Sequence, residues 1–504
     1  MTECAAMRTI IAALLLSLAS LAGAEDQTLP RSTPEAQGIP SSSILAFVEA
    51  VEEKVDSLHS LMVVRHGHVV AEGWWEPYRR EDSHVLFSLS KSFASTGIGL
   101  AIAEGKLSLD DTVVSIFPDD VPEEASDNLK SMRVRDLLSM STGHHAEAIE
   151  GFPYSGTGLT KTFLGLPVAH KPGTHFVYNT PASYMLSAIV QKVTGTKLVD
   201  YLGPRLFEPL GIASPRWDES GDGVSLGGFG LNVKTEDIAR FGQLYLRKGE
   251  WNGTRVLPGE WVEAASSRQV SNGSKPDSDW EQGYGYQFWR CRHDVYRGDG
   301  AFGQYCIVLP HHDAVIAITS GVGDMQEPLD LVWEHLLGGM KDGSLPADAD
   351  AHGRLKKKMA RLELPPLAGK PKSPLAEKIS GNVYRLPEHD GPIEAVGLEV
   401  GEKTSLLLRI DGEERRLAVG SGKWDRGGSL VLGGRLFAAS EEPVATSGAW
   451  TAEDTFTAKA CLYKTPFCAT MKLEFAGDIV LFDQEMNVGF GPTKRPQLVG
   501  RLAE

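Results

Sequence analysis

The chain has 504 residues, of which 42% are hydrophobic and 23% charged. This length predicts two or three domains, and the composition excludes a disordered chain, a collagen-like repeat and a multispan membrane protein. Lys and Arg number 50 against 66 Asp and Glu, and the resulting net charge of −16 has the wrong sign for following a phosphate backbone, which argues against nucleic acid as a partner.

The first 24 residues have the pattern of a secretory signal peptide. Arg8 precedes an apolar run over residues 10–21, and small residues then lead to Ala24. The apolar run is shorter than the roughly 20 residues that a membrane-spanning helix needs. We therefore expect cleavage after Ala24 and an exported protein without a membrane span, located in the periplasm or secreted beyond it.

Four cysteines follow the predicted cleavage site, namely Cys291, Cys306, Cys461 and Cys468. In an oxidising compartment an even number of cysteines favours disulfides, and the local pairs 291–306 and 461–468 are the natural candidates. The alternative is four buried free thiols that behave as small apolar residues. Because no Cys and His spacing suggests zinc, we expect no metal and no other cofactor.

The predicted elements begin with a β-hairpin over residues 60–72, where two β-rich runs flank His66-Gly67-His68. A helix is predicted over residues 88–104, because apolar residues recur with helical spacing and Gly105 follows. Further helices are predicted over residues 134–140, 183–193 and 236–247. Short β-rich runs then predict later strands of an antiparallel sheet over residues 284–290, 305–309 and 314–319.

The composition changes between residues 341 and 374, where five prolines surround a basic patch at residues 356–358. This segment is predicted to be a linker with room for one helix. Beyond it, over residues 375–504, short β-rich runs alternate with turn residues and predict a small all-β sandwich or barrel. These runs cover residues 395–400, 405–410, 430–432, 472–475 and 479–482.

Two motif matches do not carry the function that their patterns usually indicate. Residues 298–303 match the GxGxxG pattern, but a dinucleotide site needs a helix after the glycines, and a β-rich run follows. Residues 223–227 match GxSxG around Ser225, but a nucleophile elbow needs a strand-to-helix turn, and more glycines follow. We therefore predict a loop position for Ser225.

A stronger candidate for chemistry is Ser88 with Lys91, an SxxK motif at the start of the predicted helix over residues 88–104. A serine in the first turn of a helix lies at the positive end of the helix dipole, and a residue three positions later shares its face. A nucleophile and a base are thereby paired. The alternative is that Ser88 only caps the helix.

Two further segments fit the same chemistry. Tyr178 lies just before the predicted helix over residues 183–193, and a buried tyrosine near two cationic groups would have a lowered pKa and could relay protons. The small residues before the predicted strand 305–309 would let the chain approach Ser88 closely. The N–H groups of Ala301 and Ser88 could then stabilise an oxyanion. The alternatives are a packed core aromatic and a tight β-turn.

SxxK, a tyrosine motif and a glycine-rich strand in this order resemble the serine β-lactamase and penicillin-binding-protein superfamily, especially the branch of class C β-lactamases, D-aminopeptidases and related esterases. The stretches at residues 105–111 and 134–143 support the resemblance. It implies an α+β fold, in which an antiparallel sheet and a helical subdomain form an α/β sandwich over residues 25–340. It also implies Ser88 as the acylated nucleophile, Lys91 as its activating partner, and Tyr178 as general base and acid.

The chain departs from the family pattern where substrate would bind. The family's Tyr-x-Asn becomes Tyr178-Asn179-Thr180, and the Lys-Thr-Gly strand motif becomes Gly298-Asp299-Gly300. The missing cation would have held a substrate carboxylate, and Asp299 would repel one, so efficient β-lactam hydrolysis is disfavoured. The expected substrate-binding residues are Asn179, Thr180, Gly298, Asp299, Gly300 and Gln304.

These features predict an exported serine hydrolase that forms an acyl-enzyme with a small ester or amide, including D-amino-acid peptides. One alternative is a β-lactamase or DD-carboxypeptidase. Another is a non-catalytic protein that uses the same cleft to bind or sense penicillin or cell-wall ligands. The sequence predicts no role for the C-terminal β domain.

Overall fold

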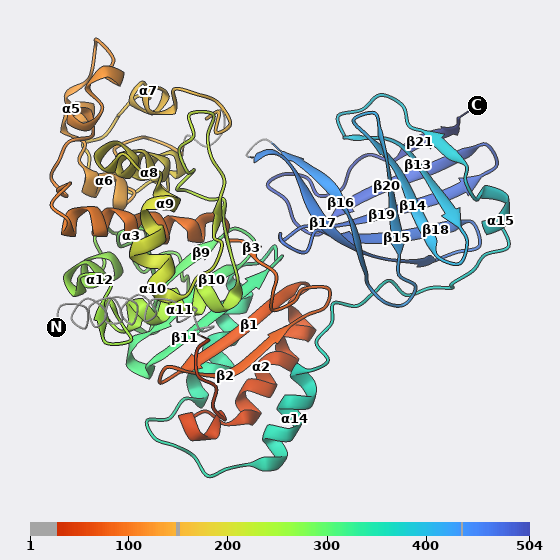
Figure 1. Cartoon of the computed structure of the whole chain (residues 1–504), viewed down its shortest axis with the longest axis horizontal. Helices are drawn as coiled ribbons and strands as arrows, with labels where there is room; N and C mark the ends of the chain where they lie inside the picture. The colour runs from red at the N-terminus through yellow and green to blue at the C-terminus, as the bar shows by residue number, and fades with distance from the viewer. Residues whose placement is uncertain (1–27, 148–151, 435–436, 504) are drawn as a thin grey trace, which may run out of the picture.

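The structure is a computed structural model that describes residues 28–147, 152–434 and 437–503. Figure 1 shows a body of helices and sheet that contains the N-terminal part of the chain, beside an all-β body that contains the C-terminal part. The expected signal peptide lies outside the described residues. Within the three described ranges, no helix combines the length and apolar character needed to cross a bilayer.

The first body is built on a six-stranded antiparallel sheet with the order β2-β1-β11-β10-β9-β8. Its strands are β1 (Leu58–Arg65), β2 (His68–Trp74), β8 (Trp289–Arg290), β9 (Tyr296–Gly300), β10 (Gln304–Leu309) and β11 (Ala314–Ser320). The hairpin predicted over residues 60–72 is confirmed as β1 and β2, and the strands predicted over 305–309 and 314–319 as β10 and β11.

Helices cover both faces of this sheet. Along β1, Met62 and Val64 pack into one apolar cluster, whereas Leu61 and Val63 pack into another. Helix α11 (Thr235–Leu246) contacts the sheet on the first side, and α2 (Ser41–Lys54) contributes to the cluster on the second. Because successive strand residues point to opposite faces, every position of β1 is buried.

A helical subdomain lies beside the sheet, at the upper left of Figure 1. Helix α3 runs through it and packs against α8 and α9. Its helices include α3 (Ser90–Ala103), α4 (Val113–Ile116), α5 (Asp127–Ser131), α6 (Val134–Leu138), α7 (Leu159–Leu164), α8 (Thr180–Thr194), α9 (Leu198–Leu202) and α12 (Gly259–Ser266). The helices predicted over residues 134–140, 183–193 and 236–247 are confirmed as α6, α8 and α11.

Two predicted elements differ in the structure. The strand predicted over residues 284–290 is reduced to β8, because Gln287 has a left-handed φ of 65° and donates its side-chain amide to the Leu137 and Leu138 carbonyls. The predicted helix starts later than expected, because a separate 3-10 turn, Phe87–Leu89, precedes α3. Ser88 therefore lies in a tight turn immediately before the α-helix.

The predicted linker holds one helix, α14 (Ala349–Met359), which packs against α2 and β2. Leu355 on this helix is buried in the same cluster as residues of β1 and α2. This part of the segment over residues 341–374 is therefore packed onto the first body.

The C-terminal body is a ten-stranded antiparallel sheet with the order β15-β14-β13-β12-β21-β20-β19-β18-β17-β16. Its strands are β12 (Val383–Arg385), β13 (Ile393–Val400), β14 (Thr404–Ile410), β15 (Glu413–Val419), β16 (Asp425–Gly434), β17 (Phe437–Trp450), β18 (Thr455–Cys461), β19 (Cys468–Ala476), β20 (Ile479–Met486) and β21 (Leu498–Leu502). The edge strands β15 and β16 contact each other, so the sheet curls into a barrel. The predicted all-β domain is confirmed.

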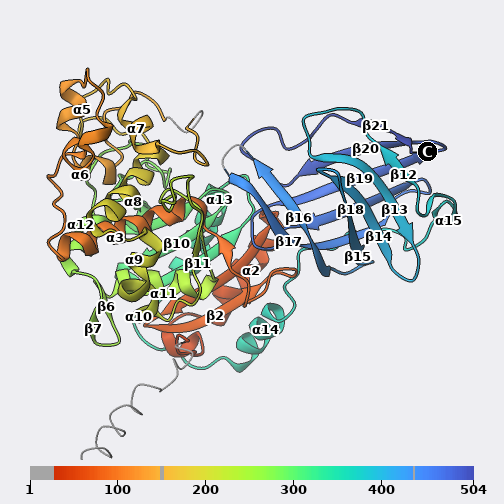
Figure 2. The same cartoon turned by 45° about the horizontal axis from the view of Figure 1, so that its top comes forward.

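The barrel contacts the first body through the loop that joins β18 to β19. The Val85 N–H donates to the Lys464 carbonyl at 2.9 Å, and the Tyr78 hydroxyl donates to the Thr465 carbonyl at 3.3 Å. Arg426 adds an ion pair with Asp82 at 2.8 Å. The rotated view in Figure 2 shows the same two bodies side by side.

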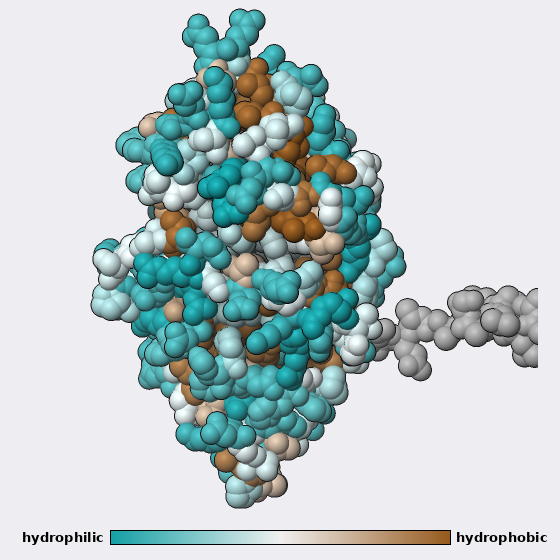
Figure 3. All heavy atoms as spheres, turned by 90° about the vertical axis from the view of Figure 1, so that its left-hand side faces the viewer, coloured by the Kyte–Doolittle hydropathy of each residue, from teal (hydrophilic) through white to brown (hydrophobic). Residues whose placement is uncertain are grey.

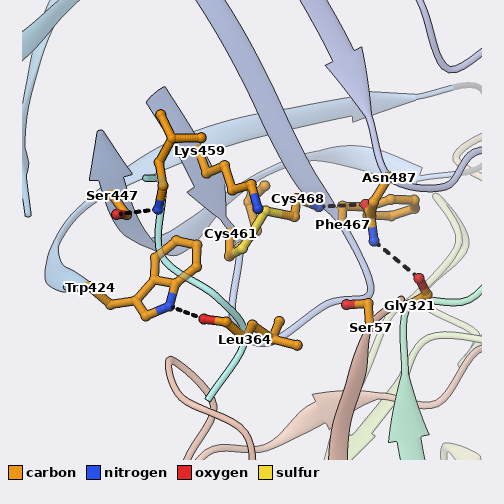
Figure 4. The surroundings of a disulfide bond; sticks show 12 residues. Ser57, Gly321, Leu364, Trp424, Ser447, Lys459, Cys461, Phe467, Cys468 and Asn487 are labelled. Atoms are coloured by element: carbon orange, nitrogen blue, oxygen red, sulfur yellow. Dashed lines mark hydrogen bonds between the residues drawn. A yellow bond between two sulfur atoms is a disulfide. The ribbon is translucent and has the colours of Figure 1, made fainter. Parts of the chain in front are cut away.

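One disulfide, Cys461–Cys468, closes this loop. Figure 4 shows it next to Asn487, whose side-chain amide donates to the Gly321 carbonyl of the first body at 3.2 Å. The expected pair 461–468 is confirmed. The expected pair 291–306 is wrong: both thiols are free and buried, because Cys291 and Cys306 belong to the apolar clusters on opposite faces of the sheet.

Removing this disulfide is expected to destabilise the barrel. Replacing Cys461 and Cys468 together with serine frees a short loop in the unfolded chain, which corresponds to about 2–3 kcal/mol. Thermal unfolding followed by circular dichroism should show a lower midpoint for the variant. A reducing agent should lower the wild-type midpoint similarly and leave the variant unchanged. An unchanged wild-type midpoint under full reduction would contradict a stabilising role.

Figure 3 shows the face that lies on the left of Figure 1. This face is largely hydrophilic, and its hydrophobic residues gather in the upper half of the view. Among the described residues, the large hydrophobic side chains that stand out as exposed are Phe490, Val499 and Leu502, all in the C-terminal body. Phe490 is 61% exposed. Single exposed apolar residues are common, but Phe490 also lies next to the turn that carries Ser88, as described below.

Candidate active site

Ser88 and Lys91 are brought together by the tight turn before α3. Phe87 has a left-handed φ of 47°, a conformation that costs about 1–3 kcal/mol for a bulky residue and that clusters at functional sites. The Lys91 Nζ donates to the Ser88 Oγ at 2.9 Å. Ser88 is partly exposed, whereas Phe87 and Leu89 on either side are buried. The structure therefore presents one hydroxyl to solvent with an amine in hydrogen-bond contact.

The amine of Lys91 is held in the protein interior. It donates to the Gly228 carbonyl at 2.8 Å and contacts the Thr180 Oγ1 at 3.4 Å, and the residue is only 1% exposed. Burial lowers the pKa of Lys91 to about 7, although the carboxylates of Glu147 and Asp299 oppose this shift. A sizeable fraction of this amine is therefore neutral near neutral pH, and only the neutral form can accept a proton.

Tyr178 lies above Lys91, with the Nζ 4.9 Å from its ring centroid and Trp289 stacked on it at 5.3 Å. Burial and the nearby Asp299 carboxylate raise the pKa of Tyr178, and the interaction with Ser88 only partly offsets them. The sequence-based argument expected a lowered pKa from two cationic groups. The direction is the opposite, because burial outweighs the effect of Arg297, and Asp299 lies close by. Tyr178 therefore stays a protonated phenol.

Strand β9 runs directly against the Ser88 turn. A Cβ atom at Gly300 would lie 2.0 Å from the Leu86 carbonyl oxygen, and one at Gly298 would lie 2.5 Å from the Leu89 side chain. Only glycine permits this approach. The turn that follows β9 contains Ala301, whose N–H is the predicted second oxyanion donor. The contact of strand and turn agrees with that prediction, and the oxyanion role itself remains a prediction.

Asp299 is not a free charge. It is 6% exposed and forms an ion pair with the fully buried Arg297, with 2.7 Å between Nη2 and Oδ2. Arg297 also donates to the Asp279 carbonyl and to the Cys291 sulfur. The expected repulsion of a substrate carboxylate by Asp299 is therefore largely neutralised, while the buried Arg297 offers no cation to replace the one that the family motif carries.

The two residues after Tyr178 have different surroundings. Asn179 is fully buried, and its side-chain amide contacts His144 and Thr142 rather than Lys91. Thr180 instead faces the site, since its hydroxyl contacts Lys91 and donates to a Glu147 carboxylate oxygen at 2.8 Å. The structure thus places Thr180, rather than Asn179, in the position next to the amine.

Gln304 supports the turn after β9. Its amide donates to the Ala301 carbonyl at 3.0 Å and to the Ser320 carbonyl at 2.8 Å, and the residue is fully buried. The side chain is thus used within the fold, and it holds the backbone of Ala301 in place.

Sequence reasoning missed several residues of this site. Arg297 lies directly before the glycine-rich segment. Because it is two residues before Asp299 along a strand, both side chains lie on the same face, and this spacing was the signal for their ion pair in the sequence. Gly228, in a segment assigned only to loop, supplies the carbonyl for Lys91, and a Cβ there would lie 2.8 Å from the Thr180 methyl group. The aromatic residues of the C-terminal body next to Phe87 had no signal in the sequence.

The chain is similar in sequence to known proteins. The chain is 25% identical over 335 residues to a 6-aminohexanoate-dimer hydrolase of Paenarthrobacter ureafaciens, covering 61% of this chain and 84% of that protein. It is also 25% identical over 235 residues to an Escherichia coli K12 protein named "Putative D-alanyl-D-alanine carboxypeptidase", covering 41% of this chain and 54% of that one.

A solved structure described as a "putative beta-lactamase" from Bacteroides dorei superposes with a TM-score of 0.51 at 17% identity, covering 59% of this chain and 99% of that chain. The similarity shows a shared fold. The family described as Beta-lactamase matches residues 48–334, which include Ser88, Lys91, Tyr178 and strand β9. The chain therefore belongs to the Beta-lactamase family.

Proposed function

We propose that this protein is a serine hydrolase that cleaves a small ester or amide through an acyl-enzyme on Ser88. The observation that carries the proposal is the 2.9 Å contact between the Ser88 hydroxyl and a buried amine whose pKa is lowered to about 7. A nucleophile in hydrogen-bond contact with a base that is partly neutral near pH 7 is the arrangement that nucleophilic catalysis requires.

The acylation step follows from these positions. The neutral Lys91 amine takes the Ser88 proton while the Oγ forms a bond to the substrate carbonyl carbon. The Ser88 and Ala301 N–H groups stabilise the oxyanion. When the oxyanion collapses, the bond to the leaving oxygen or nitrogen breaks, and the Tyr178 phenol donates its proton to that atom and regains one from the Lys91 ammonium. A water molecule, deprotonated in the same way, then releases the acid and restores Ser88.

The charges of the site favour a substrate without a carboxylate at the β9 strand. Arg297 is the only basic residue of β9, and it is fully buried against Asp299. A penicillin or a peptide C-terminus would therefore lack the charge-assisted contact on this strand that such substrates use. We place esters and uncharged amides before β-lactams as substrates.

We also propose that the mature protein is exported after cleavage at Ala24. The Cys461–Cys468 disulfide supports this, because disulfides persist in oxidising compartments and are rare in the cytosol.

The test is the intact mass of the mature protein after exposure to a fluorophosphonate, which labels activated serines without a known substrate. Wild-type protein should lack residues 1–24 and gain one adduct. Ser88→Ala should gain none. Ser225→Ala is the matched control, because this buried serine lies in the rejected GxSxG match, and its adduct should persist. A folded wild-type protein without an adduct, or an adduct that survives Ser88→Ala, would refute the proposal.

A further inference from the structure

A cavity of about 740 Å³ lies where the interior of the barrel meets the first body. Its wall in the barrel comes from β13, β14, β16, β17, β19 and β20, and the first body contributes residues near the nucleophile, among them Val85 and Phe87. The volume is within the about 300–1,000 Å³ of sites that hold small organic ligands.

The barrel explains why this space exists. A barrel of about eight strands is just wide enough for its own side chains or one small ligand, and this one has ten. The side chains that line the barrel part are mainly aliphatic, represented by Ile393, Leu408, Ile410 and Met471. A wall of this kind favours an apolar ligand, because the ligand leaves water without losing hydrogen bonds.

A cluster of aromatic rings lies between the cavity and the turn that carries the nucleophile. Phe467 and Phe490 of the C-terminal body line the cavity and contact Phe87, the residue before Ser88, with ring centroids 6.1 and 5.8 Å apart. Phe490 also contacts Phe302, the residue after Ala301, at 4.8 Å. The cavity therefore reaches Phe87, one residue before Ser88, and Phe490 of its wall contacts the residue after Ala301.

Two polar features mark the end of the cavity in the first body. The Tyr154 ring lines it, and its buried hydroxyl has no hydrogen-bond partner among the described residues. Burial raises the pKa of Tyr154, and the nearby Glu147 carboxylate raises it further. Arg216 lies at the rim, 3.7 Å from Glu442 of the barrel. The first body thus contributes polar groups to this end of the cavity, whereas the barrel residues named above are apolar.

We propose that this cavity is an acyl-chain subsite, in which the C-terminal body receives the aliphatic chain of an ester or amide whose carbonyl carbon lies at Ser88. The inference rests on the proposed function for the reaction, but it concerns a separate binding surface. It assigns the barrel a direct part in substrate selection, with Phe490 as the aromatic wall at the entrance.

Binding is tested first, on protein that cannot turn over. N-undecyl dansyl amide, an uncharged fluorescent probe, should bind the mature Ser88→Ala protein with an increase in fluorescence, and Phe490→Ala in the same background should weaken binding about three- to tenfold. Val499→Ala is the matched control, because Val499 is also an exposed apolar residue of the barrel but does not line the cavity, and binding should be unchanged. No binding, or equal binding by Phe490→Ala, would overturn the subsite.

Selectivity is tested second, on active protein, with p-nitrophenyl acetate, butyrate, hexanoate and octanoate. We expect kcat/KM to rise about three- to fourfold for each methylene that enters the cavity. Phe490→Ala should lower the ratio of octanoate to acetate about tenfold, and Val499→Ala should keep it. A flat series from an enzyme that does form the Ser88 adduct would overturn the subsite and leave the hydrolase standing. Probe binding without any adduct or turnover would refute the hydrolase but support an apolar ligand site.

Discussion

Replacing Lys91 with methionine is expected to reduce turnover by about 10⁴- to 10⁶-fold, comparable to the loss of a member of other catalytic sets. Methionine has a similar volume, but it cannot accept the Ser88 proton, so the hydroxyl loses the 2.9 Å partner that would activate it. Steady-state hydrolysis of a p-nitrophenyl ester and the rate of fluorophosphonate labelling would both measure the loss. Lys197→Met is the matched control, because this lysine is surface-exposed and pairs with Glu219, and it should leave both rates unchanged.

The pH dependence follows from the same amine. Because Lys91 must be neutral to act as a base and its pKa is lowered to about 7, the wild-type labelling rate should rise as pH increases through about 7. A labelling rate that is constant between pH 6 and 8 would contradict Lys91 as the activating base.

The stability of the Lys91→Met protein should move in the opposite direction to its activity. The pKa of Lys91 is about 7 in the folded protein and 10.5 in the unfolded chain. The buried charged amine therefore destabilises the fold by its full amount below pH 7, and this destabilisation decreases as pH rises from about 7 toward 10.5. The variant should therefore be more stable than wild type at low pH, and the difference should shrink at high pH. Urea unfolding of both proteins at several pH values measures this difference in stability. A Lys91→Met protein that fails to fold would contradict the expected stabilisation.

Replacing Arg297 with methionine is expected to lower the free energy of unfolding by about 3–5 kcal/mol, because it leaves Asp299 as an unpaired buried charge. The double variant with Asp299→Leu should recover much of the loss, since no isolated charge then remains. Urea unfolding of the two single variants and the double variant gives the coupling of the pair. Lys197→Met again serves as the control, and loss of its exposed ion pair with Glu219 should change stability by about 1 kcal/mol or less.

The Arg297 variant also affects the active site. The negative charge of Asp299 favours the protonated forms of both Lys91 and Tyr178. Without Arg297 to offset this charge, the pKa of Lys91 should be higher, and the pH profile of labelling should move to higher pH. If Arg297→Met were as stable as wild type and had an unchanged pH profile, the Arg297–Asp299 pair would neither stabilise the fold nor set the charge environment of Lys91.

Local sequence patterns predicted the elements that carry the site. Helical apolar spacing placed α3, α8 and α11 to within a few residues, because one face of each helix must be buried. The predicted strand over residues 284–290 failed where the conformation depends on a distant partner: Gln287 bonds to backbone carbonyls about 150 residues earlier in the chain. The expected 291–306 disulfide failed for a similar reason, since proximity in sequence does not show which face of a sheet a thiol occupies.

The sequence by itself determined the SxxK pair, because a separation of three residues at the start of a helix brings Ser88 and Lys91 together in almost any context. It also indicated that the small residues before the predicted strand 305–309 would let the chain approach Ser88 closely, and the structure shows that Gly298 and Gly300 make this contact. Only the tertiary structure decided the charge states and the substrate space. The pKa values of Lys91 and Tyr178, the pairing of Asp299 with Arg297, and the cavity beside Phe87 and Phe490 all depend on burial and on contacts between segments far apart in the chain, which no local pattern contains.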